Sequence, residues 1–220
     1  MASLFYRLSS SLVLCTREHP YTPIPGEQVL CLKSGAAFNP THPCTRLSLD
    51  LLREALAPGP ARTLLDVGCG TGILSLAAGA LGVPRVVGVD LAWEAALVTR
   101  ENARDNDLSA QILAVQGSTE CLQGPFGLVA ANLHIDVQLA KVGELHRLAA
   151  PGGRLILSGF RDNQEELLLE KYRLRGWSRR CRLVKEFSHP ELPPDLSFTW
   201  AAWLLERKGK SVEGTPGGPA

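Results

Sequence analysis

Short apolar runs alternate with amphipathic stretches along most of this 220-residue chain. The apolar runs are rich in valine and leucine, which is typical of strands buried on both faces of a sheet. Between several of them, apolar residues recur at the spacing of one helix face. This alternation predicts a mostly parallel sheet with helices on both faces. We expect strands at 63–67, 85–90, 111–115, 127–132 and 154–158, and helices at 45–56, 73–81, 92–106 and 137–149.

The carboxyl-terminal part of the chain follows a different pattern. After a helix expected at 164–174, two longer β-like segments at 177–187 and 197–206 follow each other with no helix between them. Only antiparallel neighbours can be joined by a loop without a crossover, so the two segments predict a hairpin at the sheet edge. The predicted fold class is α/β, with a mostly parallel seven-stranded sheet, helices on both faces and an antiparallel edge hairpin.

The two ends of the chain differ from this main part. Residues 1–37 contain β-like runs at 11–15 and 28–32 but are too few for an independent domain. We therefore expect an amino-terminal extension packed on a main domain at 38–208. The tail 209–220 is rich in glycine and proline with almost nothing apolar, so we expect it to be disordered.

Composition narrows the classes of function. Hydrophobic residues make up 45% of the chain, enough for a sizeable core, and the net charge of +1 gives no general attraction to nucleic acid or membranes. The apolar runs are too short to span a bilayer. Six scattered cysteines form no C-x-x-C pair and have no histidine at ligand spacing, which favours a reducing compartment over a disulfide framework or zinc site. We expect a cytoplasmic protein without a metal.

The turn after the first predicted strand of the sheet indicates the cofactor. Gly68, Gly70 and Gly72 follow the strand and a helix begins at Ile73. Glycines let the backbone approach a ligand closely, and a helix start offers free N–H groups. A dinucleotide site needs its third glycine at the position of Ile73. Asp66 would also repel a pyrophosphate but attract the ammonium of a methionine moiety. The loop therefore favours S-adenosylmethionine over a nicotinamide cofactor.

Polar residues follow three other predicted strands. Asp90 ends the second, where an acid accepts hydrogen bonds from both ribose hydroxyls of either cofactor. Ser118 follows the third, where its hydroxyl can accept from the adenine amino group, although a hydroxyl is a weaker acceptor there than an acid. Asn132 closes the fourth, where a carboxamide or backbone oxygen can orient the lone pair of an acceptor amine. The alternative for Asn132 is to cap the following helix.

These residues and several segments resemble a known family. Leu64–Gly72 together with Val86–Asp90 resemble the nucleotide-binding half of the Rossmann-like class I methyltransferases. Four further segments resemble the methyltransferases of ribosomal protein L11 (PrmA type), and the resemblance covers roughly 26–203. The four segments are Ser34–Thr45, Arg100–Ala103, Val129–Leu133 and Pro151–Gly159.

The resemblance implies roles for individual residues. Family members contact S-adenosylmethionine through a threonine that aligns with Thr45, a first loop glycine that aligns with Gly68, and a ribose acid that aligns with Asp90. Asn132 aligns where methyl donor and acceptor amine meet. Helix capping is the alternative for Thr45, and His42 is more simply a structural or exposed residue.

The chain departs from the family pattern at two places. The family usually has F-G-T-G-x-H-P-T-T, whereas residues 38–45 are one residue shorter and lack both glycines. The family also recognises its ribosomal substrate with a separate amino-terminal domain, for which residues 1–37 are too few.

The function expected from these features is N-methylation of a protein amine, with a ribosomal protein as one candidate substrate. The alternatives are an RNA or small-molecule acceptor, and a non-catalytic partner protein that keeps the fold. A basic run at 173–185 around Trp177 either binds RNA or an acidic protein, or, as we favour, protects a solvated edge strand. An RNA acceptor would require this run beside the cofactor crevice. The oligomeric state stays open.

Overall fold

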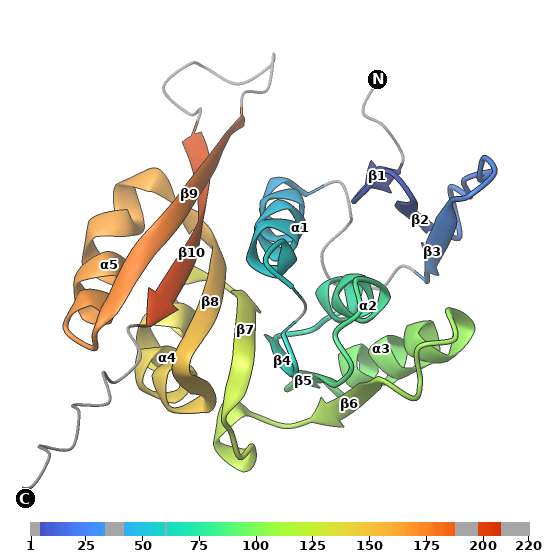
Figure 1. Cartoon of the computed structure of the whole chain (residues 1–220). Coiled ribbons are helices and arrows are strands. Elements are labelled where there is room, and N and C mark those ends of the chain that lie inside the picture. The colour runs from blue at the N-terminus through green and yellow to red at the C-terminus, as the bar shows by residue number, and fades with distance from the viewer. Residues whose placement is uncertain (1–4, 34–41, 60, 188–197, 208–220) are drawn as a thin grey trace, which may run out of the picture.

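The structure is a computed structural model that describes residues 5–33, 42–59, 61–187 and 198–207 (Figure 1). The predictions for the motif segment at 34–41 and for the tail at 209–220 lie outside the described residues. The main sheet has seven strands in the order β6-β5-β4-β7-β8-β10-β9. These strands are β4 (Leu64–Val67), β5 (Val86–Asp90), β6 (Ile112–Gln116), β7 (Phe126–Asn132), β8 (Ala149–Arg161), β9 (Trp177–Phe187) and β10 (Phe198–Arg207).

The pairing of these strands confirms the predicted fold class. Strands β4 to β8 pair in parallel, whereas β10 pairs antiparallel with both β8 and β9. Five α-helices and two short 3-10 helices connect the strands in the described part of the chain. They are α1 (Pro43–Leu56), α2 (Ile73–Ala80), α3 (Trp93–Asp105), η1 (Thr119–Cys121), α4 (Ile135–Leu148), η2 (Asp162–Gln164) and α5 (Glu165–Arg173). None of these helices is long and apolar enough to cross a membrane.

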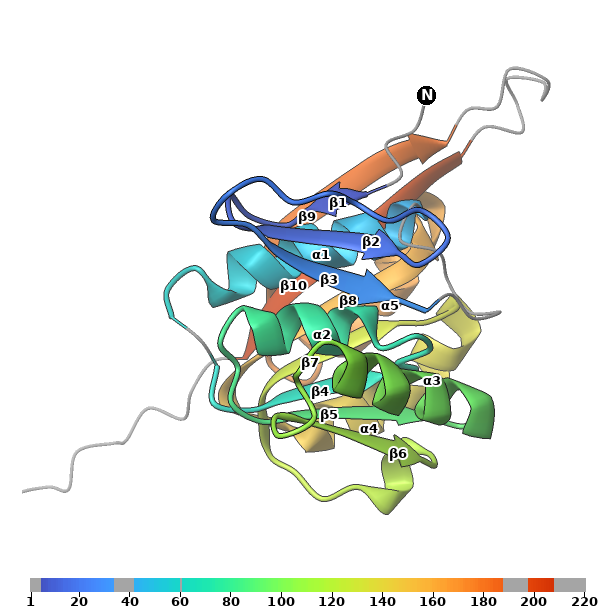
Figure 2. The same cartoon turned by 90° about the vertical axis from the view of Figure 1, so that its right-hand side faces the viewer.

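Successive residues of a strand face opposite sides of the sheet, and this builds two apolar cores. Leu64 and Ala130 face α1 and α2 in one core, while their neighbours Leu65 and Val129 face α4 and α5 in the other. The central strands are therefore apolar at most positions, because both faces of the sheet are covered by helices. Figure 2 shows α1, α2 and α3 in front of the sheet and α4 and α5 behind it.

Strand β8 is longer than the predicted strand at 154–158. Its pairing with β7 jumps from Phe126 opposite Ala149 to Leu128 opposite Arg154, so the residues between bulge out of the ladder. The positive φ of Gly152, +72°, lies in this bulge. The segment Pro151–Gly153 is therefore an irregularity inside a strand. Pairing with β10 as far as Arg161 extends the other end.

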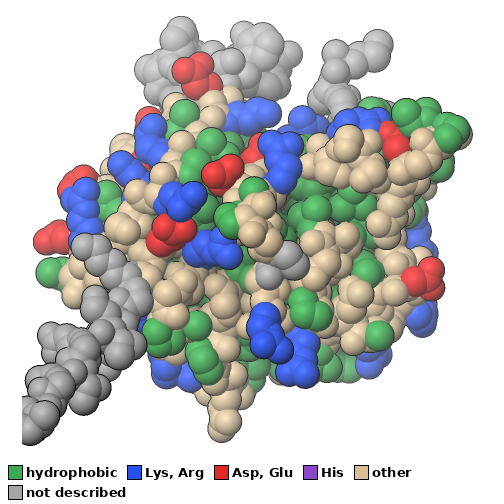
Figure 3. All heavy atoms as spheres, viewed as in Figure 1, with side chains coloured by type: hydrophobic (Ala, Val, Ile, Leu, Met, Phe, Trp, Pro, Cys, Tyr) green, Lys and Arg blue, Asp and Glu red, His purple; other side chains and the backbone are tan. Residues whose placement is uncertain are grey.

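Strand β9 forms one edge of the main sheet and carries much of the basic run. Its arginines are paired locally: Arg179 and Arg182 contact the mostly buried Glu165 at 3.1 and 2.7 Å, and Arg180 contacts Glu206 at 3.2 Å. In Figure 3, positive and negative side chains are interspersed over this side of the molecule. The pattern fits a charged, solvated edge strand better than a uniformly basic surface.

The amino-terminal residues form a second sheet of three strands. Strand β1 (Tyr6–Arg7) pairs antiparallel with β2 (Leu12–Thr16), which pairs in parallel with β3 (Gln28–Leu32). Leu14 and Leu30 are fully buried in the same apolar core as α1 and α2. Figure 2 shows this small sheet lying over these helices.

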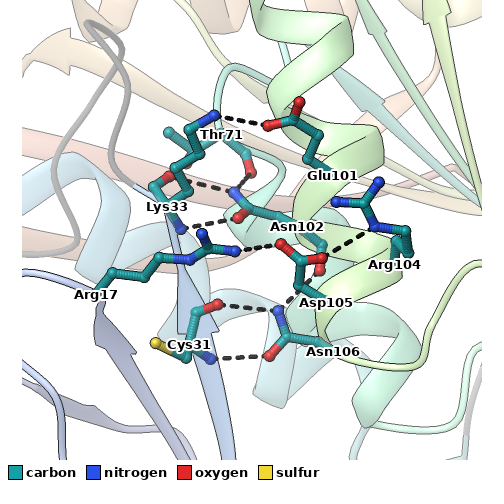
Figure 4. A network of polar contacts seen from close by, with 9 residues as sticks. All are labelled: Arg17, Cys31, Lys33, Thr71, Glu101, Asn102, Arg104, Asp105 and Asn106. Carbon is teal, nitrogen blue, oxygen red and sulfur yellow. Dashed lines mark hydrogen bonds and ion pairs between the residues drawn. The ribbon is translucent and has the colours of Figure 1, made fainter.

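Asn102 of α3 and Asn106, the C-cap residue of that helix, form hydrogen bonds with the open edge of this small sheet (Figure 4). The Asn106 side chain accepts from Cys31 N at 2.8 Å and donates to Cys31 O at 3.0 Å. Asn102 accepts from Lys33 N at 2.8 Å and donates to Lys33 O at 3.3 Å. Because residues four apart lie on one helix face, the two amides replace a neighbouring strand. Asn102 also donates to Thr71 O at 2.8 Å, which ties the sheet edge to the glycine loop.

Candidate active site

A cavity of about 620 Å³ lies at the carboxyl ends of the central strands. This is the place where open α/β sheets bind ligands, and the volume is within the range of small-molecule sites. Seven of the eight site residues predicted from the sequence line it, while Gly72 does not. The seven are Thr45, Asp66, Gly68, Gly70, Asp90, Ser118 and Asn132.

The glycine loop runs from β4 to the start of α2. Gly68 and Gly72 have φ values of +70° and +78°, a conformation that favours glycine. A Cβ atom on Gly68 would lie 2.4 Å from Leu133 Cδ2, and one on Gly72 would lie 2.8 Å from Thr99 Cγ2. Gly72 is the N-cap residue of α2. It therefore sets the position of the helix, whereas Gly68 and Gly70 form the wall of the cavity.

Asp90 ends β5 and is held by backbone amides. Its Oδ2 accepts from Gly70 N and its Oδ1 accepts from Ala92 N, both at 3.0 Å. A carboxylate oxygen has two lone-pair directions, so each oxygen keeps one for a further donor. The side chain lines the cavity in this fixed orientation and can accept bonds from two neighbouring hydroxyls.

Asp66 is the penultimate residue of β4 and is buried next to the glycine loop. Its Oδ2 accepts from the backbone N and the Oγ of Ser75 at 3.1 and 2.7 Å, which joins β4 to α2. Burial raises the pKa of this carboxyl to about 6, and the charge of Asp90 adds to the increase. The bonds from Ser75 work in the opposite direction. A cation in the adjoining cavity would stabilise the ionised form.

Thr45 lies inside α1 and is not its cap. The cap is His42, whose Nδ1 accepts from Cys44 N at 3.2 Å, and Pro43 is the first helical residue. The interpretation of Thr45 as a helix cap is therefore wrong, because proline fixes the helix start two residues earlier. Thr45 is fully buried, lines the cavity, and its Oγ1 has no hydrogen-bond partner among the described residues. A buried hydroxyl without a partner is costly, which points to a ligand that completes it.

Asn132 ends β7 at the edge of the cavity. The side-chain atom placed as Oδ1 lies 2.9 Å from Ser158 Oγ. The cap of α4 is His134 and the helix begins at Ile135, so the alternative role of Asn132 as a helix cap is wrong. The buried Gln138 donates to Leu133 O at 2.7 Å and to Ser158 O at 2.6 Å. It thus holds the backbone of the residue that follows Asn132 and of the residue that faces Asn132 on β8.

Ser118 also lines the cavity and has polar neighbours. Its hydroxyl donates to Glu120 and accepts from Lys141 Nζ at 3.0 Å. Its proton is therefore used, and one lone pair remains for a donor such as an amino group. The sequence reasoning missed Lys141, which also lines the cavity, because a lysine in a helix usually faces solvent.

The sequence reasoning also missed Ser48, Ser158 and Gln138 near Asn132. Each is fully buried. Ser48 and Gln138 lie within predicted helices and Ser158 ends a predicted strand, so none stands out by its local spacing. The lone polar residue within an apolar stretch is the only signal that could have found them.

The basic run does not reach the cavity. None of Arg173, Arg175, Arg179, Arg180, Arg182 and Lys185 is among the lining residues. The condition for an RNA acceptor, a basic run beside the crevice, is therefore not met.

The sheet order, the glycine loop and the strand-end Asp90 together define a Rossmann-like class I methyltransferase fold. Solved structures agree with this class. The structure of a ribosomal protein L11 methylase from Lactobacillus delbrueckii subsp. bulgaricus superposes with a TM-score of 0.77 at 22% identity, covering 94% of this chain and all of that one. An O-methyltransferase from Bacillus cereus, solved in complex with S-adenosylhomocysteine (SAH), gives 0.54 at 14% identity, covering 74% of this chain and 81% of that one.

The chain belongs to the ribosomal protein L11 methyltransferase (PrmA) family, whose family model matches residues 6–186. A ribosomal protein L11 methyltransferase of Syntrophotalea carbinolica is 39% identical over 173 residues, which cover 77% of this chain and 56% of the relative. The one from Thermotoga maritima is 37% identical over 151 residues, again 56% of its length. The chain thus spans about half the length of these curated relatives.

Proposed function

We propose that this protein is an S-adenosylmethionine-dependent methyltransferase that methylates an amine of a protein substrate. The observation that carries the proposal is the buried, unpartnered hydroxyl of Thr45 on the same cavity as the glycine loop, Asp90 and Asn132. A hydroxyl in this position needs a polar partner from a ligand. Membership of the PrmA family supports the choice of ligand.

The residues of the cavity suit the parts of this cofactor. The Asp90 carboxylate has free lone pairs for the two ribose hydroxyls, and Ser118 has one for the adenine amino group. Gly68 and Gly70 leave room for the amino-acid portion, whose ammonium would offset the charge of Asp66. Thr45 Oγ1 would bond the same portion, and Gly72 acts indirectly by setting the start of α2. When bound, S-adenosylmethionine supplies an electrophilic methyl group.

The protein's own contribution to the reaction is alignment. A lysine side chain with a pKa of about 10.4 is mostly protonated at neutral pH, so only its neutral form can attack a methyl group. Asn132 stands where an amide oxygen can accept an N–H of that neutral amine and direct its lone pair. The buried thiols of Cys44 and Cys69 also line the cavity, but burial raises the pKa of each to about 12. They stay protonated and do not compete for the methyl group.

A protein acceptor is favoured over the alternatives. The names of the relatives give ribosomal protein L11 as their substrate, and a ribosomal protein is therefore the first candidate here. The position of the basic run disfavours RNA, and the presence of seven predicted site residues on one cavity disfavours a non-catalytic partner protein. The experiment below also includes small molecules as possible methyl acceptors. The cytoplasmic location stays a prediction.

The test is incubation with a methyl donor that carries a radiolabelled methyl group. Recombinant ribosomal protein L11, bulk ribosomal RNA and a small-molecule extract serve as separate acceptors, and Asp90→Ala is the control for cofactor-dependent label. We expect label in the protein fraction, retained as methylated amine after acid hydrolysis. Label in RNA or small molecules alone would overturn the protein acceptor. No label in any fraction together with no SAH binding would overturn the methyltransferase function itself.

A further inference from the structure

Two buried serines connect Asn132 to helix α1. Ser158 on β8 and Ser48 on α1 are both fully buried, and their Oγ atoms lie 2.5 Å apart. Ser158 Oγ lies 2.9 Å from the side-chain atom of Asn132 that is placed as Oδ1, and Ser48 Oγ donates to Cys44 O at 2.8 Å. The four groups form one chain of three short contacts that runs from the cavity into the helix.

The number of protons in this chain determines which end of the Asn132 amide faces Ser158. Each hydroxyl carries one proton, so two protons serve three contacts if the amide presents its oxygen. One contact would then bring two oxygens within 3 Å with no proton between them, at serine side chains that are fully buried. If the amide presents its nitrogen, Asn132 donates to Ser158, Ser158 to Ser48, and Ser48 to Cys44 O. All three contacts are then hydrogen bonds.

We infer that Ser158 and Ser48 are positioning residues that turn the Asn132 amide so that its nitrogen is bound to Ser158 and its oxygen faces the cavity. Oxygen and nitrogen of an asparagine amide are distinguished only through such networks. The backbone of Ser158 is itself held, because its carbonyl accepts from Gln138 Nε2 and from Leu133 N at 2.6 and 3.1 Å. The hydroxyl therefore has a fixed location from which to orient the amide.

The orientation matters for the chemistry of the proposed function, on which this consequence rests. An amide oxygen facing the cavity accepts an N–H of the acceptor amine and leaves the amine lone pair free. An amide nitrogen in the same place would donate to that lone pair and occupy it. Helix α1 contributes both to the proposed cofactor contact, through Thr45, and to the orientation of Asn132, through Ser48. These two residues are three positions apart on one helix face. One helix would thus affect both the bound cofactor and the acceptor amine.

The amide orientation can be tested without any turnover. Asparagine-selective ¹⁵N labelling gives a side-chain amide signal for Asn132, assigned by its loss in Asn132→Asp. We expect nuclear Overhauser contacts from these amide protons to the Ser158 Hβ protons and slow exchange of one proton with solvent. In Ser158→Ala the exchange should accelerate and the amide shifts should move toward those of an exposed asparagine. An Asn132 signal that lacks the contacts and is unchanged in Ser158→Ala would overturn the inference.

The functional part is tested by separating turnover from cofactor binding. In Ser158→Ala we expect kcat for methylation of ribosomal protein L11 to fall about tenfold or more, because alignment is lost, while the Kd for SAH stays within about twofold. Ser48→Ala is the second variant: without Ser48 as acceptor, the Ser158 proton is free to turn to Asn132 and reverse the amide. Ser178→Ala, on β9 and outside the cavity lining, is the matched control and should change neither quantity.

The outcomes separate this inference from the proposed function. If wild-type protein transfers no methyl group but the amide signals behave as expected, the proposed function fails and the orientation stands. If methyl transfer is normal in both Ser158→Ala and Ser48→Ala, the positioning role is wrong although the function holds.

Discussion

Asp66 and Asp90 lie at the ends of adjacent strands but differ in their surroundings. Asp66 is 2% exposed and shares one oxygen with two donors of Ser75, whereas Asp90 is part-exposed and receives one backbone donor on each oxygen. Water cannot solvate the charge of Asp66, so its ionised form needs compensation from within the site. The two carboxylates therefore differ at one cavity: burial raises the pKa of Asp66, whereas each oxygen of Asp90 keeps a lone pair for a further donor.

Cofactor binding should depend on pH through Asp66. With its pKa raised to about 6, the carboxyl is ionised above that pH and protonated below it. The ammonium of SAH is attracted only to the ionised form, so the affinity should fall as the pH drops through 6, by up to about tenfold per pH unit. Calorimetric titration between pH 5 and pH 8 measures this. Asp66→Asn should bind weakly at every pH, and a wild-type affinity that is flat over this range would contradict the ammonium contact.

Removing the Asp90 carboxylate should weaken SAH binding strongly. Two hydrogen bonds to a charged acceptor are worth about 1.5 kcal/mol or more each, so we expect Asp90→Ala to lose about 100-fold in affinity by calorimetry. Asp90→Asn keeps an acceptor oxygen and should lose less. An unchanged affinity in Asp90→Ala, with the unfolding temperature also unchanged, would remove this residue from the ribose role.

At the scale of elements, α3 links the amino-terminal sheet to the glycine loop. Asn106 contacts only the sheet edge at Cys31 and the helix itself, whereas Asn102 contacts Lys33 and also Thr71 of the loop (Figure 4). The two residues are one helical turn apart and make otherwise similar bonds. Replacing each in turn therefore distinguishes an effect on the stability of the protein from an effect on the geometry of the glycine loop.

Replacing these asparagines should separate the two effects. Asn102→Leu leaves Lys33 N and Thr71 O without their partner, and we expect a loss of about 2–3 kcal/mol in the free energy of unfolding together with weaker SAH binding. Asn106→Leu should lose comparable stability but keep its SAH affinity. Denaturant unfolding and calorimetry measure the two quantities. Equal loss of affinity in both variants would show that the link to Thr71 has no effect on the loop.

At the scale of the whole molecule, the small sheet and the main sheet share one apolar core. Leu14 and Leu30 lie in the same cluster of buried residues as Leu51 of α1 and Leu76 of α2. Burial of apolar side chains is the main favourable term in folding, and it depends on the area buried and not on which part of the chain contributes it. The amino-terminal residues should therefore unfold together with the rest.

A substitution in the small sheet should lower the stability of the entire protein. Leu14→Ala removes a fully buried side chain and should cost about 2–5 kcal/mol, seen as one unfolding transition at a lower temperature. Ile24→Ala, at a side chain that is 60% exposed, should stay within about 0.5 kcal/mol of wild type. Scanning calorimetry that resolves a separate early transition in Leu14→Ala would contradict a shared core.

The local pattern of the sequence was enough to predict the sheet, its edge hairpin and seven of the residues that line the cavity. Apolar runs such as Val86–Val89 and the helical spacing between them depend only on residues two to four positions apart, and backbone geometry converts these spacings into strands and helices. Glycines in the loop and acids at strand ends come together for the same reason, because parallel strands share one carboxyl edge.

Tertiary structure alone decided which polar groups meet inside the protein. Ser48 and Ser158 are 110 residues apart and touch only because α1 packs on β8. The unpartnered hydroxyl of Thr45 and the exclusion of Gly72 from the cavity wall follow from the same packing. Spacing along the chain carries no record of such contacts, since the distances between elements are set by how their apolar faces fit. The sequence thus determined what each element is, and the fold determined what its buried polar side chains do.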